Sequence, residues 1–222
     1  MEHKKTAKNN LEEWFSHERM KTYSFHPDPE ALYLWNTHVT KAFLEDIQHI
    51  EVLLRNRVHM VVSEKYGPRW YAHPHIPFTF QAKNSINKAE RRTRSDEAQT
   101  PPPGRVIAEL SFDFWRYLFT NTYATTIWPL VQKTLVATQD CNGDGSLVPS
   151  LADFQDEVDV VYKLRNRCAH HEPIIKQNMQ SENTELDQAQ KAIKLLATWI
   201  DPDAAEWITA HSRITDLRSV RP

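Results

Sequence analysis

The stretch DPEALYLWNTHVTKAFLEDIQHIEVLLRNRVHMVVSEKYGP, Asp28 to Pro68, carries large apolar residues at intervals of three and four. This spacing places them on one face and predicts a single long amphipathic helix. Asp28 as N-cap and Pro29 at the first helical position mark its start. We expect the helix to end near Gly67, since glycine is a common helix stop. The apolar positions are Leu32, Trp35, Val39, Phe43, Ile47, Ile50, Leu54, Val58 and Val61.

Prolines separate further helical segments around this stretch. Glycine is scarce, at 4 of 222 residues, which disfavours a strand-rich protein with many tight turns, and we see no strand alternation. We predict an all-α protein of one domain, residues 1–222, in which a linker at 95–105 separates helical parts at 11–94 and 106–213. The other expected helices are 11–23, 80–94, 106–119, 123–136, 151–171, 184–200 and 201–212.

The composition is that of a folded protein, 40% hydrophobic and 25% charged, with a formal net charge of −2. Any nucleic-acid contact must therefore come from a local basic patch. The two cysteines, Cys141 and Cys168, form neither a disulfide framework nor a zinc cluster, which fits a reducing interior. No signal-peptide core and no run long enough to span a bilayer is visible, so we expect a cytoplasmic protein without a membrane partner.

Two short motifs resemble metal sites without completing them. DCNGDGS, Asp140 to Ser146, matches the opening of a calcium loop, but the twelfth position is Leu151 and not a glutamate. His73-Pro74-His75 has no second Cys/His pair at zinc spacing. We interpret these motifs as a polar turn and a surface loop, and we expect neither a metal nor a cofactor.

The stretch RNRCAHHEP, Arg165 to Pro173, places a polar group at the end of an apolar helical pattern. Asn166 and His170 are four residues apart and share a helix face, whereas Arg165 points to the side of the apolar stripe. A guanidinium there needs an acceptor, such as a carboxylate, a partner chain or a phosphate. The proline disfavours helix at the residue before it, so the histidines lie near a helix end, where they are accessible.

These residue types suit metal-free cleavage of RNA. Histidine acts as general acid or base near neutral pH, arginine stabilises charge on a phosphate, and asparagine orients either one. The substrate 2′-OH would attack the adjacent phosphate and leave a 2′,3′-cyclic phosphate. This reaction needs a base and an acid on opposite sides, and a two-fold axis would bring two copies of His170 and of Arg165 into one cleft. We therefore predict a homodimer, with His171 as the alternative acid–base.

RNRCAHHEP resembles the Arg-x4–6-His signature of HEPN domains, which have a polar residue after the arginine. ALYLWNTHVTKAFLEDIQHIEVLLRN, VIAELSFDFWRYLFTNTYATTIWP and KLLATWIDPDAAEWI resemble, in order, the Abi-like (AbiD/AbiF) family of bacterial abortive-infection proteins. The resemblance extends from about Leu11 to Ser212. It places Arg165, Asn166 and His170 at catalytic positions.

The same resemblance implies a HEPN-type helical bundle with additional N-terminal helices, active as a homodimer. It implies a metal-independent endoribonuclease that binds RNA and acts in anti-phage defence or as a toxin. An antitoxin protein or a regulatory RNA is then a candidate partner.

A second LRNR occurs at Leu54 to Arg57 on the long helix, where the following histidine is one residue too near to fit the signature. Glu51 is four residues before Arg55, a good intrahelical pairing distance. We predict that Glu51, Arg55 and Asn56 form a polar layer facing the motif helix, with Glu51 as acceptor for Arg165 or Arg55. Separate solvated surface residues are the alternative.

Two further groups of side chains have two interpretations each. A basic patch either guides RNA to the cleft or is a solvated helix face. A set of aromatics either stacks on bases or, as its helical spacing favours, packs in the core. The basic residues are Lys83, Lys88, Arg91, Arg92 and Arg94. The aromatic residues are Phe112, Phe114, Trp115, Tyr117, Phe119 and Trp128.

Two rival functions stand beside the ribonuclease. The first is a non-catalytic RNA- or nucleotide-binding scaffold that uses the motif as a phosphate grip. The second is a structural interaction module in which Arg165 is paired internally.

Overall fold

The computed structural model describes residues 10–94, 100–139 and 146–222. Its longest element is α3 (Pro29–Tyr66), a helix of 38 residues that confirms the long helix predicted from the apolar repeat. Asp28 caps the start by accepting a hydrogen bond from the Ala31 N–H. Gly67 ends the helix with φ 81, a conformation that residues with a side chain rarely adopt.

The prediction of an all-α protein is confirmed. In the described part of the chain, the exception is an antiparallel pair of two-residue strands, β1 (Thr138–Gln139) and β2 (Ser146–Leu147). Residues 10–15 form a helical turn before α2. The other elements are α2 (His17–Lys21), η1 (Trp70–Ala72), α4 (Phe80–Thr93), α5 (Pro103–Glu109), α6 (Phe112–Tyr117), η2 (Asn121–Tyr123), α7 (Trp128–Gln132), α8 (Leu151–Ala169), α9 (Met179–Ile200), α10 (Pro202–His211) and α11 (Ile214–Ser219).

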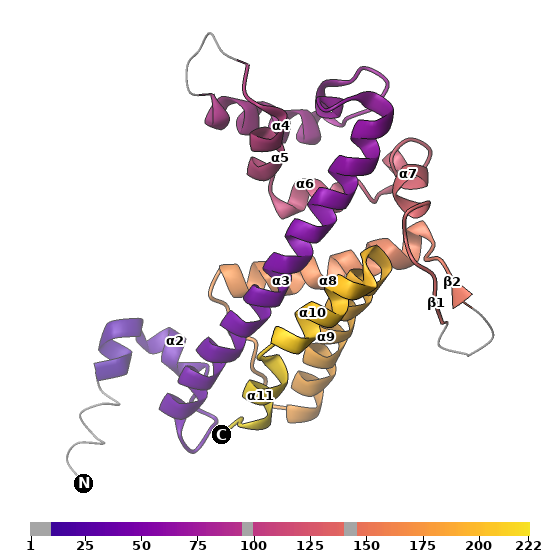
Figure 1. Cartoon of the computed structure of the whole chain (residues 1–222). Helices are drawn as coiled ribbons and strands as arrows, with labels where there is room; N and C mark the ends of the chain where they lie inside the picture. Colours follow the sequence, from indigo (N-terminus) through magenta and orange to yellow (C-terminus); the bar gives the residue numbers. More distant parts are fainter. Residues whose placement is uncertain (1–9, 95–99, 140–145) are drawn as a thin grey trace.

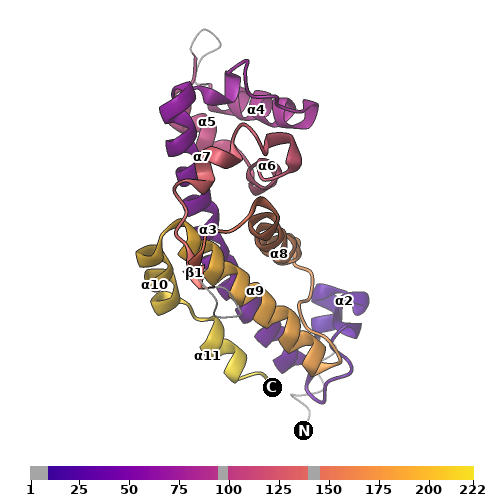
Figure 2. The ribbon, with the colours of Figure 1, turned by 90° about the vertical axis from the view of Figure 1, so that its right-hand side faces the viewer.

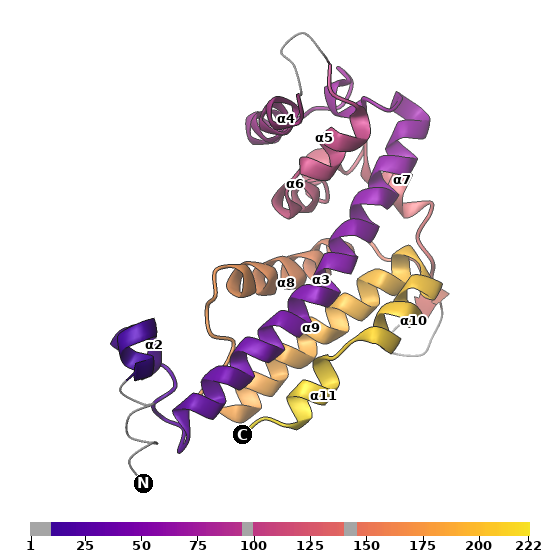
Figure 3. The ribbon, with the colours of Figure 1, turned by 60° about the vertical axis from the view of Figure 1, so that its left-hand side comes forward.

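Helix α3 runs through the molecule as a spine (Figure 1). Helices α4, α5 and α6 gather at its C-terminal end, while α9 and α11 lie along its N-terminal part (Figure 3). Helix α8 crosses α3 between these two groups and contacts α3, α6 and α9. The motif helix is therefore held from several sides, and its C-terminal end faces α2 (Figure 2).

The aromatic set of α6 to α7 belongs mostly to the core, which confirms that interpretation for five of its members. Trp115 and Phe119 are fully buried, and Phe119 packs on Phe154 of α8 with ring centroids 4.7 Å apart. Tyr117 differs, since 37% of it is exposed. This packing fixes α6 and α7 against α8.

Two expected helices are broken by identifiable contacts. The segment 11–23 is interrupted at Ser16, which has φ 74 and caps α2 by accepting from the Arg19 N–H. The segment 106–119 is interrupted at Leu110, where the indole N–H of Trp115 donates to the Leu110 carbonyl at 3.2 Å. A buried indole thus takes the acceptor that a continuous helix would have used.

Other boundaries also differ from the expectation. Helix α9 begins at Met179, five residues before the expected start, because Asn178 caps it by accepting from the Ser181 N–H. Helix α7 is shorter than the expected 123–136, and α11 was not predicted. Of the linker expected at 95–105, residues 95–99 lie outside the described residues, and Pro103 already begins α5.

Candidate functional site

Helix α8 carries the motif because its sequence specifies both its start and its buried face. Ser150 and Asp153 form a capping box, in which each side chain accepts from the other residue's backbone N–H. Val158, Val161 and Cys168 then follow at helical spacing and are fully buried. This stripe orients the helix, so that the polar residues between the apolar positions are presented at defined angles.

The helix ends in a turn that carries both motif histidines. His170 is the C-cap, and His171 has φ 58. The His171 N–H donates to the Cys168 carbonyl, and the Glu172 N–H donates to the Arg167 carbonyl. These two bonds form a Schellman motif, in which glycine usually occupies the position that His171 holds.

Both imidazoles are exposed at this turn. Neither ring has a hydrogen-bond partner within residues 10–94, 100–139 and 146–222. They are therefore open to a ligand or to a second chain.

Arg165 and Asn166 lie half-buried one helical turn before the histidines. Arg165 Nη1 donates to Asn166 Oδ1 at 3.5 Å, a long bond. The described part of the chain gives Arg165 no carboxylate within 4 Å. An arginine paired internally for structural reasons would show such a partner, so this geometry leaves the guanidinium available.

Glu51 of α3 lies within electrostatic range of Arg165. Burial raises the pKa of the Glu51 carboxyl, and the positive charges of Arg165 and then of Arg55 oppose that rise. No ion pair within 4 Å joins Glu51 to either arginine in the described residues. Arg55 Nη1 lies 3.5 Å from the Ala108 carbonyl of α5, and Asn56 is exposed. The pKa of Glu51 is thus lowered by the charge of Arg165, while Asn56 points to solvent.

Sequence reasoning missed Arg167, which connects the motif helix α8 to α9. Its guanidinium pairs with Glu185 of α9 at 3.2 Å and donates to the Pro173 carbonyl at 2.7 Å. The signal was its position three residues before His170, on the side of α8 that faces α9. Arg167 thereby ties the turn to α9 and leaves Arg165 as the free arginine of the motif.

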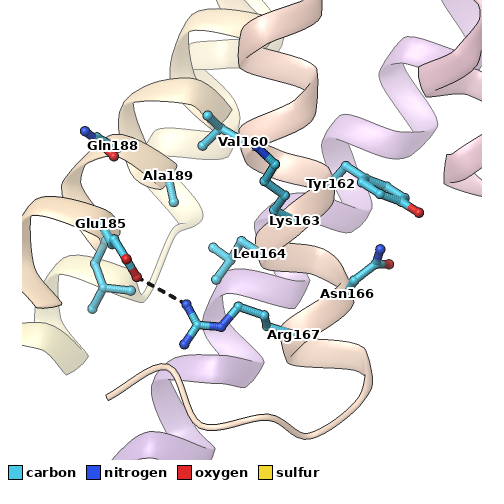
Figure 4. A pocket seen from close by; sticks show the side chains of 10 residues that line it. Val160, Tyr162, Lys163, Leu164, Asn166, Arg167, Glu185, Gln188 and Ala189 are labelled. Atoms are coloured by element: carbon cyan, nitrogen blue, oxygen red, sulfur yellow. Dashed lines mark hydrogen bonds and ion pairs between the residues drawn. The ribbon is translucent and has the colours of Figure 1, made fainter. Parts of the chain in front are cut away.

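Tyr162 is a second missed residue, four positions before Asn166 on the same face (Figure 4). Asn166 lowers the pKa of the Tyr162 phenol, but the Asp113 carboxylate and partial burial raise it more, so the net pKa is raised. The phenol therefore stays protonated at neutral pH and can donate a hydrogen bond. The Arg116 guanidinium lies 4.7 Å from the centre of its ring, which holds Tyr162 against α6.

A cavity of about 580 Å³ lies over the outer surface of α8 and α9 (Figure 4). Most of its surface is apolar, and Lys163, Asn166, Arg167, Glu185 and Gln188 provide polar groups. The residues that line it are Val160, Tyr162, Lys163, Leu164, Asn166 and Arg167 of α8, and Glu185, Leu186, Gln188 and Ala189 of α9. The motif therefore adjoins an open hollow.

The basic patch lies on α4 and its C-cap Arg94, and its residues are all exposed: Lys83, Lys88, Arg91, Arg92 and Arg94. Arg92 pairs with Glu109 of α5 at 3.0 Å, and this pair reduces the free charge of the patch. Helix α4 contacts α6, which in turn contacts α8. The patch is thus separated from the motif by one helix.

In the described residues, the two motifs that resemble metal sites are not completed by further ligands. His73 and His75 lie on a surface loop after η1, where the His75 N–H donates to His73 Nδ1. Residues 140–145 of the calcium-like motif lie outside the described residues. Within the described ranges, no three His, Cys, Asp or Glu side chains gather as a metal ion would require. None of the described helices is both long and apolar enough to cross a membrane.

The fold and motif define an all-α protein whose polar motif lies at an accessible helix end. Residues 9–176 match the sequence profile of a family described as Abi-like protein. The chain therefore belongs to the Abi-like family, and this membership suggests a role in abortive infection. The match includes α8 and its terminal turn and ends before α9. No curated protein and no solved structure matches the chain.

Proposed function

We propose that this protein is a metal-independent HEPN-type endoribonuclease that acts in anti-phage defence or as a toxin. The observation that carries the proposal is the state of the motif at the end of α8. Arg165 has no carboxylate partner among the described residues, and the imidazoles of His170 and His171 are exposed at the end of the same helix. An arginine and a histidine left available on one helix end suit the binding of a phosphodiester.

The chemistry follows from these groups. One imidazole takes the proton of the 2′-OH, and the 2′-oxygen attacks phosphorus. The bond from phosphorus to the 5′-oxygen breaks, and a second acid protonates that leaving oxygen. Arg165 stabilises the added negative charge on the phosphate oxygens, and Asn166 orients it. The products are a 2′,3′-cyclic phosphate and a 5′-OH end.

The acid and the base must stand on opposite sides of the phosphate. His170 and His171 are adjacent on one turn, so a single chain supplies imidazoles from one side only. Two copies related by a two-fold axis would supply the opposite side with another His170 and Arg165. We therefore propose a homodimer with a composite site.

The test is cleavage of a labelled RNA in the presence of EDTA. Wild type should cleave and leave cyclic phosphate ends, and His170→Ala should lower the rate by at least about a hundredfold, the usual contribution of an acid–base group. His75→Ala, which removes an exposed histidine from a distant loop, is the matched control and should cleave normally.

The alternative is a non-catalytic scaffold that grips RNA or nucleotide phosphate with the motif. It predicts that wild type binds RNA without cleaving it, and that Arg165→Ala weakens binding. Retained binding with lost cleavage in His170→Ala would instead support the enzyme.

A further inference from the structure

The turn that ends α8 is held in a disfavoured conformation. His171 has φ 58, in the left-handed region where a side chain crowds the backbone. Residues other than glycine stay in this region when surrounding contacts hold them, and such positions gather at functional sites. The two backbone bonds of the Schellman motif close this turn but do not extend beyond α8 and the turn itself.

A third contact comes from a remote part of the chain. Arg19 Nη2 donates to the carbonyl oxygen of His171 at 2.9 Å, across 152 residues of sequence. Figure 2 shows α2, which carries Arg19, beside the connection from α8 to α9. The bond therefore fastens the strained residue to a separate element.

The Arg19 side chain is itself held in place by aromatic rings. Its guanidinium lies 5.8 Å from the centre of the Tyr33 ring of α3. Phe15 stacks on Tyr33 at 5.3 Å, and Tyr23 meets Tyr33 edge-on at 5.3 Å. The guanidinium thus loses less conformational freedom on binding the carbonyl than a free surface arginine would.

The helix that carries Arg19 also begins at a strained residue. Ser16 has φ 74, and in the described part of the chain Ser16 and His171 are the non-glycine residues with positive φ. Ser16 caps α2 by accepting from the Arg19 N–H at 3.4 Å. One strained residue begins the helix that presents Arg19, and the other presents the carbonyl that Arg19 binds.

We infer that Arg19 is a positioning residue, which locks the turn after α8 and so fixes the His171 imidazole relative to His170, Arg165 and Asn166. This inference rests on the proposed ribonuclease function. A change of φ at His171 would turn the imidazole of His171 relative to His170, Arg165 and Asn166, which stay with α8, and it would open the turn that follows the C-cap His170. Arg19 itself touches the backbone and not the substrate.

The kinetic test compares Arg19→Ala and Arg19→Lys with wild type in the RNA cleavage assay. Arg19→Ala should lower kcat about tenfold and leave KM within about twofold, because a misplaced catalytic group slows the chemical step more than it weakens binding. Arg19→Lys should keep most of the activity, since an ammonium can also donate to the carbonyl. Lys21→Ala, which removes an exposed charge from the same helix, is the control and should have no effect.

A rise in KM with unchanged kcat, together with a weaker salt dependence, would overturn the inference, because Arg19 would then bind RNA phosphate directly. An unchanged kcat and KM in Arg19→Ala would overturn it too. These outcomes bear on Arg19 alone and leave the ribonuclease proposal intact.

A second measurement needs no RNA. Hydrogen exchange at the His171 and Glu172 amides should be faster in Arg19→Ala than in wild type or Lys21→Ala. Protection should return in Arg19→Ala/His171→Gly, because glycine adopts the turn without the clamp. Unchanged exchange, or no rescue by glycine, overturns the inference. If wild type does not cleave RNA, the ribonuclease proposal falls, and exchange still decides whether Arg19 locks the turn.

Discussion

At the scale of single residues, the notable carboxylate is Glu51, which is partly buried on α3. Burial disfavours its ionised form, and Arg165 and Arg55 compensate this only in part, so its pKa remains raised. A glutamine would fill the same space without that cost. We interpret the retained charge as serving Arg165, whose positive charge lowers the pKa of Glu51 and lies on α8, a helix in contact with α3.

The first prediction concerns the pH dependence of Glu51→Gln. A raised pKa means that the folded state binds the proton more tightly than the unfolded chain. This contribution to stability is complete below the unfolded pKa and is lost as the pH rises through the folded pKa. The stability of Glu51→Gln relative to wild type should therefore increase as the pH rises from about 4, near the ordinary pKa of glutamate, through the raised pKa of Glu51, measured by urea unfolding.

The same variant should cleave RNA more slowly, because the charge that orients Arg165 is gone. Glu64→Gln, an exposed change on the same helix, is the control and should alter neither quantity. A variant that loses stability relative to wild type as the pH rises would contradict the prediction.

At the scale of elements, the C-terminal segment is joined to α9 by a buried ion pair. Arg221 donates to both carboxylate oxygens of Glu182, at 2.6 and 3.1 Å, and the Lys176 N–H donates to the same carboxylate at 2.7 Å. The Glu182 and Arg221 side chains are 1% and 9% exposed. The guanidinium also lies 5.4 Å from the Trp35 ring of α3, so the pair joins three elements.

The second prediction is that Arg221→Ala strongly destabilises the fold. It leaves a buried carboxylate without its counter-ion, which typically costs about 3–5 kcal/mol. For a chain of this length that lowers the Tm by roughly 10 °C, measurable by thermal unfolding followed by circular dichroism. Glu45→Ala, which breaks the exposed pair with Arg213, should change the Tm little. Equal shifts for the two variants would contradict the prediction.

The elements differ in how far their sequences determine them. Helix α3 was predictable because caps and an apolar repeat agree from Asp28 to Gly67. The break at Leu110 was not, because it depends on the Trp115 indole reaching a carbonyl in the folded core. Local sequence carries caps and periodicity, whereas a tertiary hydrogen bond that replaces a helical one leaves no local signal.

Some features of the candidate site were also predictable from local sequence, whereas others depend on tertiary contacts. Its spacing placed Asn166 and His170 on one face, but the left-handed conformation of His171 could not be foreseen without a glycine to mark it. The ion pair of Arg167 with Glu185 and the hydrogen bond from Arg19 to the His171 carbonyl could not be foreseen either, since each partner is distant in the sequence.

At the scale of the whole molecule, α3 spans the fold and α8 crosses it, so that the motif turn lies at the surface near α2 (Figures 1 and 2). The cavity over α8 and α9 opens beside the same motif. The net charge of −2 gives no general attraction to RNA, so the proposed RNA binding must come from local groups such as the motif arginines. Two copies meeting at this surface would double those local charges.

The third prediction is that activity depends on protein concentration. If two chains build one site, the monomer has no complete acid–base pair, and the rate per chain should fall on dilution through the dimer dissociation constant. Well below that constant, the total rate should rise with the square of the protein concentration. Sedimentation equilibrium on the same samples gives the fraction of dimer, and this fraction should track the rate. A constant rate per chain in samples that sediment as monomers would show that one copy suffices, and the composite site would be excluded.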